Sequence, residues 1–380
     1  MIRPQAYKFQ IRPNGEQVRK MKQFVGCCRY VYNRALAEHN EAYEADHSVH
    51  FNYFEIANKL PLWKAELSWL KECNAQILQQ SLKNLAQAFT NFFEKRANYP
   101  KFKCKGDRDS ARFPQGVKLD EANNRVYLPK IGWMRYRNSQ CVLGTIKNVI
   151  ISQKCGKWYM SIQTEREVVT PTPKGGEVGI DLGVVRPVTL STGKYFEPID
   201  TYKKIRGRIA KLQQQLKNKT KFSKNWKRLQ SRINKLYHKS ANIRKNYLHQ
   251  ITSQISKNHA IVYVEDLQVE NMTKSAKGTV ENPGKNVKAK SGLNRAILDQ
   301  GWGEFRRQLD YKLLWNGGYL IAVPPQNTSR TCPMCGHVSK ENRQTQAKFV
   351  CVCCGFSENA DVVGAMNVLK RGQLQLAAEK

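Results

Sequence analysis

The stretch CPMCGHVSKENRQTQAKFVCVCCGFSENADVVGAMN, residues 332–367, decides how the rest of the chain is interpreted. It contains two Cys-x-x-Cys pairs with fifteen residues between them. Four thiolates at this spacing can surround one Zn²⁺ tetrahedrally and leave no open coordination position, so the stretch predicts a structural zinc ribbon. Cys353 is a competing ligand, but its neighbours repeat the spacing of the first pair, and a glycine follows each pair. The predicted zinc ligands are Cys332, Cys335, Cys351 and Cys354.

An acidic residue follows the ribbon and has two counterparts upstream. Asp361 lies seven residues after Cys354, at the start of a predicted helix, whereas Asp181 lies in a predicted strand and Glu265 ends another. Helices between these strands fit a mixed α/β sheet, in which Asp181 and Glu265 would lie side by side at the carboxyl ends. Three such carboxylates predict a site for two Mg²⁺ or Mn²⁺ ions that supports phosphodiester hydrolysis.

The composition points to a polyanionic partner. The 380 residues include 64 Lys and Arg but only 30 Asp and Glu, which gives a formal net charge of +34. Such a positive field favours nucleic acid, and the absence of an apolar run of 18 residues argues against a membrane. The odd count of 11 cysteines, with no secretory leader at Met1, predicts a reducing, cytoplasmic location, associated with the nucleoid.

The first half of the chain reads as a β domain interrupted by helices. Alternating residues predict a strand before Pro13, and apolar residues recur every three or four positions in two later segments. Short strands with turns follow from residue 99. We predict a small β-barrel from residues 1–15 and 99–173, with residues 16–98 as a helical insertion.

The second half reads as an α/β domain that contains the ribbon. We assign residues 174–325 and 357–380 to this domain and residues 326–356 to the zinc ribbon. Residues 201–264 contain seventeen Lys and Arg and no Asp or Glu, and their periodicity predicts two basic helices within 201–257, with a break near 218–221. A mobile lid loop is expected at 271–292, a helix at 294–314 and a strand at 319–323.

At these motifs the sequence resembles the TnpB proteins encoded by bacterial insertion sequences. The resemblance is carried by Gly179-Ile180-Asp181-Leu182-Gly183, Val264-Glu265-Asp266-Leu267, Leu293-Asn294-Arg295 with Gly301-Trp302-Gly303-Glu304-Phe305, the residues 331–337, and Asn359-Ala360-Asp361 to Asn367. Residues 82–85, 91–93, 100–103, 128–132 and 156–159 agree in the first half. The resemblance covers nearly the whole chain, and its C-terminal motifs are the more specific ones.

This resemblance implies an RNA-guided DNA endonuclease related to the small type V CRISPR nucleases. A RuvC-type, RNase-H-like domain would cut double-stranded DNA that pairs with a transposon-derived guide RNA, next to a short adjacent motif. The barrel would be the wedge domain, the inserted helices the recognition lobe, and the protein a monomer in its RNA complex. Asp181, Glu265 and Asp361 match the family's metal-binding triad.

Base pairing reads most of the target in guided nucleases, while the protein reads a short duplex motif. We predict that Tyr53, Gln76, Gln79 and Gln115 read that motif, because their polar side chains can contact base edges. The alternative for each is a solvated surface side chain with no partner. The cations chosen to clamp phosphates are Lys203, Lys204, Arg206 and Arg208. Lysines 274, 277, 285, 288 and 290 would let the lid loop meet the substrate.

Two other functions remain open at this level. A nuclease-inactive guided binder or repressor would keep the basic helices and the ribbon but would not need three carboxylates. A DNA transposase shares such acids, yet we find no end-recognition or multimerisation module. One departure from the family follows Asp361, where many relatives carry an asparagine and two alanines but this chain has Val362-Val363-Gly364-Ala365. The altered neighbours Val363 and Gly364 put the fine positioning of Asp361 in doubt.

Overall fold

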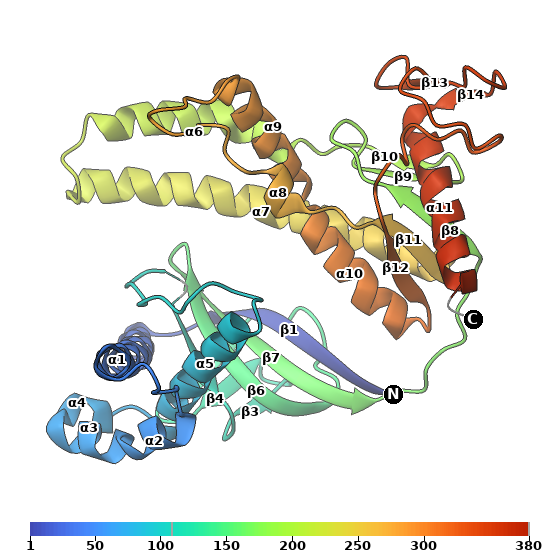
Figure 1. Cartoon of the computed structure of the whole chain (residues 1–380). Helices are drawn as coiled ribbons and strands as arrows, with labels where there is room; N and C mark the ends of the chain where they lie inside the picture. The colour runs from blue at the N-terminus through green and yellow to red at the C-terminus, as the bar shows by residue number, and fades with distance from the viewer. Residues whose placement is uncertain (108, 379–380) are drawn as a thin grey trace. The chain divides into compact units, whose positions relative to one another are not determined.

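The computed structural model describes residues 1–107 and 109–378 and divides into two compact units, Met1–Val168 and Val169–Lys380. Figure 1 shows the helices and strands of both units. Within the described residues, no helix has the length and apolar character needed to cross a membrane.

The first unit is built on one antiparallel sheet of seven strands in the order β2-β6-β7-β1-β5-β4-β3. The strands are β1 (Ile2–Arg12), β2 (Ser110–Phe113), β3 (Lys118–Asp120), β4 (Arg125–Leu128), β5 (Gly132–Tyr136), β6 (Thr145–Lys154) and β7 (Lys157–Glu167). Strand β1 is central, because it pairs with β7 along most of its length and with β5 at its end. The first strand therefore joins strands that follow it by more than a hundred residues, as the sequence predicted.

The sheet order ends in β2 on one side and β3 on the other. Closure into a barrel would require a ladder between these two edge strands, and the ladders found among residues 1–107 and 109–168 include none. The barrel therefore remains a prediction, whereas a twisted antiparallel sheet is observed.

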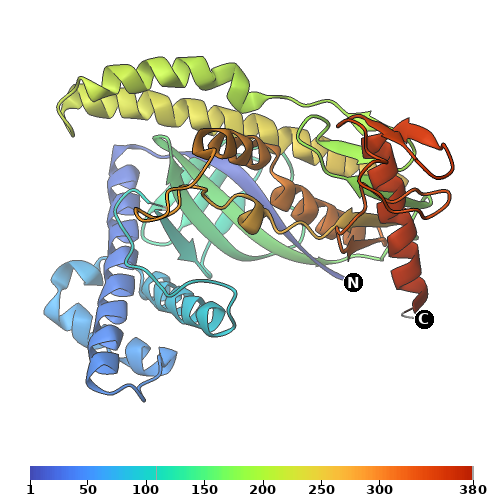
Figure 2. The ribbon, with the colours of Figure 1, turned by 45° about the horizontal axis from the view of Figure 1, so that its top comes forward.

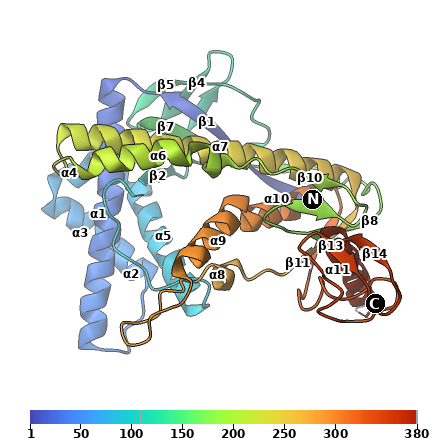
Figure 3. The ribbon, with the colours of Figure 1, turned by 90° about the horizontal axis from the view of Figure 1, so that it is seen from above.

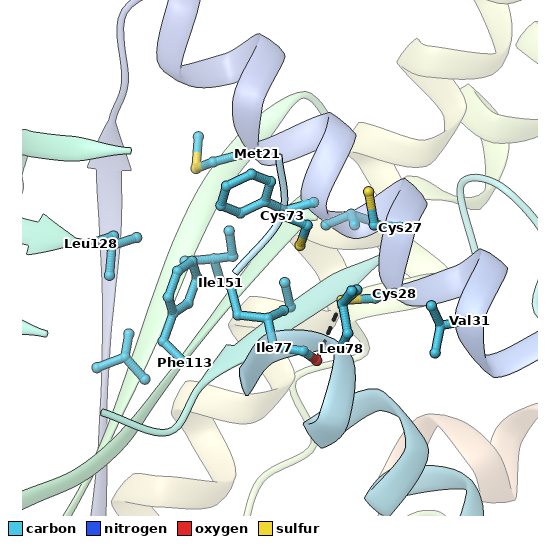
Figure 4. Close-up of a cluster of buried hydrophobic side chains, with 14 of the residues drawn as sticks. Met21, Cys27, Cys28, Val31, Cys73, Ile77, Leu78, Phe113, Leu128 and Ile151 are labelled. Carbon is cyan, nitrogen blue, oxygen red and sulfur yellow. Dashed lines mark hydrogen bonds between the residues drawn. The ribbon is translucent and has the colours of Figure 1, made fainter. Parts of the chain in front are cut away.

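All helices among the described residues of this unit lie between β1 and β2 in the chain. They are α1 (Gly15–Ala45), α2 (Tyr53–Asn58), α3 (Leu60–Glu66), α4 (Ser68–Lys71) and α5 (Ala75–Phe93). Helix α1 begins with a capping box, in which the Asn14 side chain accepts from the Gln17 backbone N–H and the Gln17 side chain accepts from that of Asn14. Figure 4 shows Cys28 of α1 beside Ile77 of α5, and the Cys28 thiol donates to the Ile77 carbonyl at 3.9 Å.

The second unit is built on a five-stranded sheet in the order β10-β9-β8-β11-β12. Its strands are β8 (Glu177–Asp181), β9 (Val188–Leu190), β10 (Tyr195–Phe196), β11 (Ile261–Glu265) and β12 (Tyr319–Val323), and β8, β11 and β12 are parallel. Helices connect the parallel strands, which is the mixed α/β arrangement that the sequence predicted.

Helices cover both faces of this sheet (Figures 1 and 2). The helices described in this unit are α6 (Thr201–Lys217), α7 (Lys224–Asn258), α8 (Val269–Met272), α9 (Val287–Gln300), α10 (Trp302–Trp315) and α11 (Ala360–Ala378). The buried residues of α7 and α10 join Val262 and Val264 in one core. Tyr263, which points to the opposite face, packs with Val368 of α11.

The structure corrects two expectations in this unit. The segment 294–314 was expected to be one helix, but α9 and α10 are separated at Gly301, whose φ of 71° is left-handed and interrupts the helix. The expected loop 271–292 is shorter, because α8 ends at Met272 and α9 already begins at Val287. The expected break at 218–221 is present between α6 and α7.

Candidate metal centre

The parallel register of β8 and β11 brings two acids to the same edge of the sheet. Their ladder pairs Val264 with Ile180, so the next residue of each strand is an acid, Glu265 and Asp181. Side chains alternate along a strand, so these acids share the face of Tyr263, which α11 covers. The two carboxylates therefore point toward α11 at the carboxyl ends of neighbouring strands.

Helix α11 supplies the third acid. Asp361 lies in its first turn, where its backbone N–H donates to the side chain of Asn359 at 3.1 Å. One turn later, a Cβ on Gly364 would lie only 3.2 Å from Oδ1 of Asp181. Residues three apart share a helix face, so Asp361 lies on the side of α11 that meets Asp181.

Closeness of α11 to the sheet depends on Gly179 of β8. A Cβ at this position would lie 2.1 Å from the carbonyl oxygen of Ala365 and 2.6 Å from the backbone nitrogen of Leu369. No side chain fits in that space, so a glycine two residues before Asp181 allows the helix backbone to approach the strand. This approach brings the first turn of α11 to the two strand carboxylates.

The electrostatics of the three acids reflect this proximity. Burial, followed by the negative charges of Glu265 and Asp361, raises the pKa of Asp181 to about 8. Burial also raises the pKa of Glu265 and the pKa of Asp361. One buried and two partly buried acids that repel one another favour a bound cation, which would offset both the repulsion and the cost of burying charge.

Two hydrogen-bonding residues hold Glu265 and the loop that enters the ribbon. The Thr328 hydroxyl donates to Oε1 of Glu265 at 2.6 Å, and this bond lowers the pKa of the Glu265 carboxyl against the effect of burial. Asn367 of α11 donates to the carbonyl oxygens of Thr328 and Thr331 at 2.8 and 2.7 Å. The ribbon's leading loop, α11 and Glu265 are therefore tied together.

The ribbon also contributes a cation to the centre. Arg343 lies between the two cysteine pairs, and its Nη2 is 3.8 Å from Oδ1 of Asp361. Its charge lowers the pKa of all three acids. Sequence reasoning missed both Arg343 and Thr328, because each lies in an irregular polar stretch without any periodic or motif signal.

The four predicted cysteines lie together. Sγ of Cys332 is 3.6 Å from that of Cys354, Sγ of Cys335 is 3.6 Å from that of Cys351, and all four sulfurs lie within 4.8 Å of one another. A Zn–S bond of about 2.3 Å in a tetrahedron implies sulfur separations of about 3.8 Å, so the arrangement fits zinc. Cys353 is exposed and lies outside this group.

The ribbon and α11 share one small core. The ribbon strands β13 (Lys348–Val350) and β14 (Ser357–Asn359) pair with each other. Phe349 and two zinc-site cysteines pack with Ala360 and Val363 of α11. Val363, one of the two departures from the family pattern, therefore docks the helix on the ribbon. The cysteine cluster thus supports the turn that carries Asp361.

The residues predicted to contact nucleic acid lie on α2, α5 and α6 and just after β2. Gln76 and Gln79 lie three residues apart on α5, and Tyr53 begins α2 with the ammonium of Lys83 5.6 Å from its ring centre. Gln115 is exposed after β2. The basic candidates Lys203, Lys204, Arg206 and Arg208 are all exposed on α6.

A polar pocket of about 200 Å³ lies between α5 and β2, beside the residues chosen as readers of the adjacent motif. Gln80, Asn84, Lys103 and Arg112 contribute its polar and charged side chains. The predicted readers Gln76 and Gln79 do not line this pocket, although Gln79 directly precedes Gln80 in the helix. The helical periodicity of α5 alone does not show which of its polar residues faces a cavity.

Three family models match the chain. Residues 161–276 match OrfB of IS605, described as "Probable transposase", residues 302–368 match "Cas12f1-like, TNB domain", and residues 1–48 match "Helix-turn-helix domain". In the structure, this last segment contains one strand and one long helix, β1 and α1.

Two curated relatives align along nearly their whole length. A protein of Escherichia coli (strain K12) named "Putative RNA-guided DNA endonuclease InsQ" is 55% identical over 380 residues, covering 99% of this chain and 94% of the relative. A "Putative RNA-guided DNA endonuclease" of Streptomyces pristinaespiralis is 30% identical over 378 residues, covering 97% and 89% of the two chains.

A solved structure, the cryo-EM structure of the Cas12f1-sgRNA-target DNA complex, superposes with a TM-score of 0.61 at 16% identity and covers 93% of this chain and 82% of that one. This likeness shows a shared multidomain fold. The identity over full length to the curated relatives confirms the resemblance seen in the sequence: the chain belongs to the TnpB family of insertion-sequence proteins, the family of OrfB of IS605.

Proposed function

We propose that this protein is an RNA-guided DNA endonuclease that hydrolyses phosphodiester bonds with divalent metal ions. The observation that carries this proposal is the convergence of Asp181, Glu265 and Asp361 from β8, β11 and α11 on one face of the sheet. The full-length relatives named as RNA-guided DNA endonucleases support the guided activity and the two partners, a guide RNA and a target DNA duplex.

The carboxylates would hold two Mg²⁺ or Mn²⁺ ions, since both metals prefer oxygen ligands. When bound, such ions supply an activated water and charge stabilisation at the leaving oxygen. The chain's own groups prepare the centre: the Thr328 hydroxyl orients Glu265, and the Arg343 guanidinium balances the charge of Asp361. Arg343 lies where it could also contact a phosphate that approaches the three acids.

The four clustered cysteines would hold one structural Zn²⁺ ion. We assign residues 326–356 to this ribbon and residues 174–325 and 357–380 to the RuvC-like domain that surrounds it. Residues 1–15 and 99–173 would form the wedge domain, and residues 16–98 the recognition lobe. This division is supported by the single antiparallel sheet and by the helices inserted after its first strand.

The exposed cations of α6 would clamp phosphates of the guide or of the guide–target duplex without reading bases. Tyr53, Gln76, Gln79 and Gln115 are the proposed readers of the adjacent motif. The protein is proposed to act as a monomer with its RNA, in the bacterial cytoplasm and at the nucleoid.

Plasmid cleavage with the natural RNA tests the proposed function. The RNA that co-purifies with the protein would be sequenced, transcribed and recombined with it, and then given a plasmid library that carries the guide complement beside randomised flanks. We expect Mg²⁺-dependent double-strand cleavage of a subset of flanks and no cleavage with EDTA. Absence of cleavage across the whole library would reject the nuclease and favour a guided binder.

Thr328 provides a graded test of the metal centre. Thr328→Val removes the hydroxyl that bonds Glu265 while keeping the side-chain volume, so the carboxylate loses its orientation and becomes easier to protonate. We expect the cleavage rate or the Mn²⁺ affinity to fall about 10- to 100-fold, as for other groups that orient metal ligands. Thr328→Ser, which keeps the hydroxyl, should stay close to wild type. Equal losses in both variants would mean that packing, not the hydrogen bond, matters at this position.

A further inference from the structure

The tip of the α6–α7 hairpin presents an aromatic ring to solvent. Phe222 lies in the connection between the helices and is 63% exposed. Its ring meets that of Trp226 edge to face, with 5.5 Å between ring centres, and the ammonium of Lys221 lies 5.2 Å from the centre of the Phe222 ring. The ring is therefore held by its neighbours while much of its surface stays accessible.

The backbone at this position is unfavourable for a bulky residue. Phe222 has a φ of 68°, in the left-handed region that glycine adopts without a steric penalty. Phenylalanine at this turn costs stability, and its exposure means that little burial offsets the cost. A ring kept in such a position is best explained by a use outside the folded chain.

The surroundings of the ring are cationic. The hairpin belongs to the segment 201–264, which contains seventeen Lys and Arg and no acid, and lysines occur at 217, 219, 221, 224 and 227 around the tip. No side chain between residues 210 and 232 is fully buried. A groove or tip that combines lysines with an accessible aromatic ring is the pattern with which proteins bind single-stranded nucleic acid.

The hairpin reaches well beyond the sheet (Figures 1 and 3). Leu248 of α7 still belongs to the core over the sheet, whereas the helix begins at Lys224, 24 residues earlier. At a rise of 1.5 Å per residue, the tip extends roughly 35 Å past that core. The ring is therefore separate from the three carboxylates and has no part in the metal centre.

We infer that Phe222, on its Trp226 support, is a stacking site for an unpaired nucleobase of the guide RNA. This inference rests on the proposed function for the identity of its ligand. RNA is favoured over the displaced DNA strand because a folded RNA presents splayed bases at fixed loops and bulges. RNA-binding proteins commonly stack an unpaired loop or bulge base on an aromatic side chain, while lysines neutralise the flanking phosphates.

An RNA-binding measurement tests this inference. The co-purifying guide RNA is transcribed in vitro and bound to the full-length protein without Mg²⁺ and without DNA. The Kd would be measured over a range of salt concentrations for wild type, Phe222→Ala, Phe222→Tyr and Lys221→Ala. Ile243→Ala is the matched control, because Ile243 is a 45% exposed apolar residue on the same hairpin.

We expect Phe222→Ala to weaken the Kd about 5- to 100-fold with an unchanged salt dependence, as the loss of one base stack requires. Phe222→Tyr and Ile243→Ala should stay within about twofold of wild type. Lys221→Ala should lower the slope of log K against log salt by about 0.7, the value for one phosphate contact on a single strand.

An affinity of Phe222→Ala within twofold of wild type, or an equal loss in Phe222→Tyr or Ile243→Ala, would overturn the inference. The inference would also be overturned if Phe222→Ala lost affinity only for a single-stranded DNA of the displaced sequence and kept its affinity for the guide RNA. The proposed function fails separately, because RNA binding is measured without cleavage. A wild-type protein that needs Phe222 for RNA but never cuts matched DNA would reject only the nuclease.

Discussion

Glu265→Gln should abolish Mg²⁺-dependent cleavage of guide-matched DNA, lowering the rate by about 10³-fold or more. The amide keeps the shape of the side chain and can still accept from the Thr328 hydroxyl, but it removes one negative charge from the centre. Metal ions contribute several kcal/mol to such reactions, and each 1.36 kcal/mol corresponds to a tenfold change in rate. Plasmid cleavage and guide-RNA affinity would be measured together, and the RNA affinity should not change.

The matched control for this substitution is the next residue. Asp266→Asn removes a carboxylate one position further along, whose Oδ1 instead pairs with Nη1 of Arg306 at 2.5 Å, in an exposed salt bridge. Exposed pairs of this kind contribute about 0–1 kcal/mol. The cleavage rate of Asp266→Asn should therefore stay within about threefold of wild type. If Glu265→Gln still cleaved at that level, the carboxylate cluster would not be the metal centre.

Cys351→Ser should remove the zinc and most of the activity together. Structural zinc in small domains contributes about 10–16 kcal/mol of apparent binding energy that the folded ribbon depends on. Cys351 also packs in the core that contains Phe349 and Val363, so its loss should free the first turn of α11 and displace Asp361. Metal analysis should fall from one zinc per chain to less than about half, with cleavage reduced at least about 100-fold.

Cys353→Ser provides the contrast inside the same tripeptide. The Cys353 side chain is exposed and lies outside the four-sulfur cluster, so this variant should keep one zinc and near-normal cleavage. The reverse result, with zinc lost in Cys353→Ser and kept in Cys351→Ser, would show that the ligand assignment is wrong. Guide-RNA binding by Cys351→Ser would further separate a local loss of the ribbon from general unfolding.

Sequence patterns predicted the elements that have strong periodicity or contain a motif. The apolar runs around Asp181 and before Glu265 predicted strands, and β8 and β11 are neighbours in the sheet. The Cys-x-x-Cys pairs predicted a group of four thiols, and those four lie together. That these groups bind magnesium and zinc stays a proposal, because geometry alone does not identify the ion.

Features that depend on long-range packing were not predictable. The contact of Arg343 with Asp361 depends on how the ribbon docks, and no local pattern in a polar loop records that docking.

The helix break at Gly301 was missed because a single glycine inside a periodic segment is often tolerated.

Gly364 shows how a departure from a family pattern acquires a physical meaning. Its missing side chain leaves the Asp181 carboxylate uncrowded, since even a methyl group would lie 3.2 Å from Oδ1. An alanine at this position would require Asp181 to shift by a few tenths of an ångström. The glycine therefore allows the Asp181 carboxylate more freedom than an alanine would.

Asp181 and Asp361 lie far apart along the chain, so the ribosome adds them at different times. The ribosome adds Asp361 180 residues after Asp181, which at bacterial rates of about 5–20 residues per second is a delay of roughly 9–36 s. In the last part of that interval, once Glu265 has been added, the nascent chain contains the segments of the basic hairpin and both strand acids, but not the helix that carries the third acid. The basic surface of this unit is therefore synthesised before the third acid of the candidate metal centre.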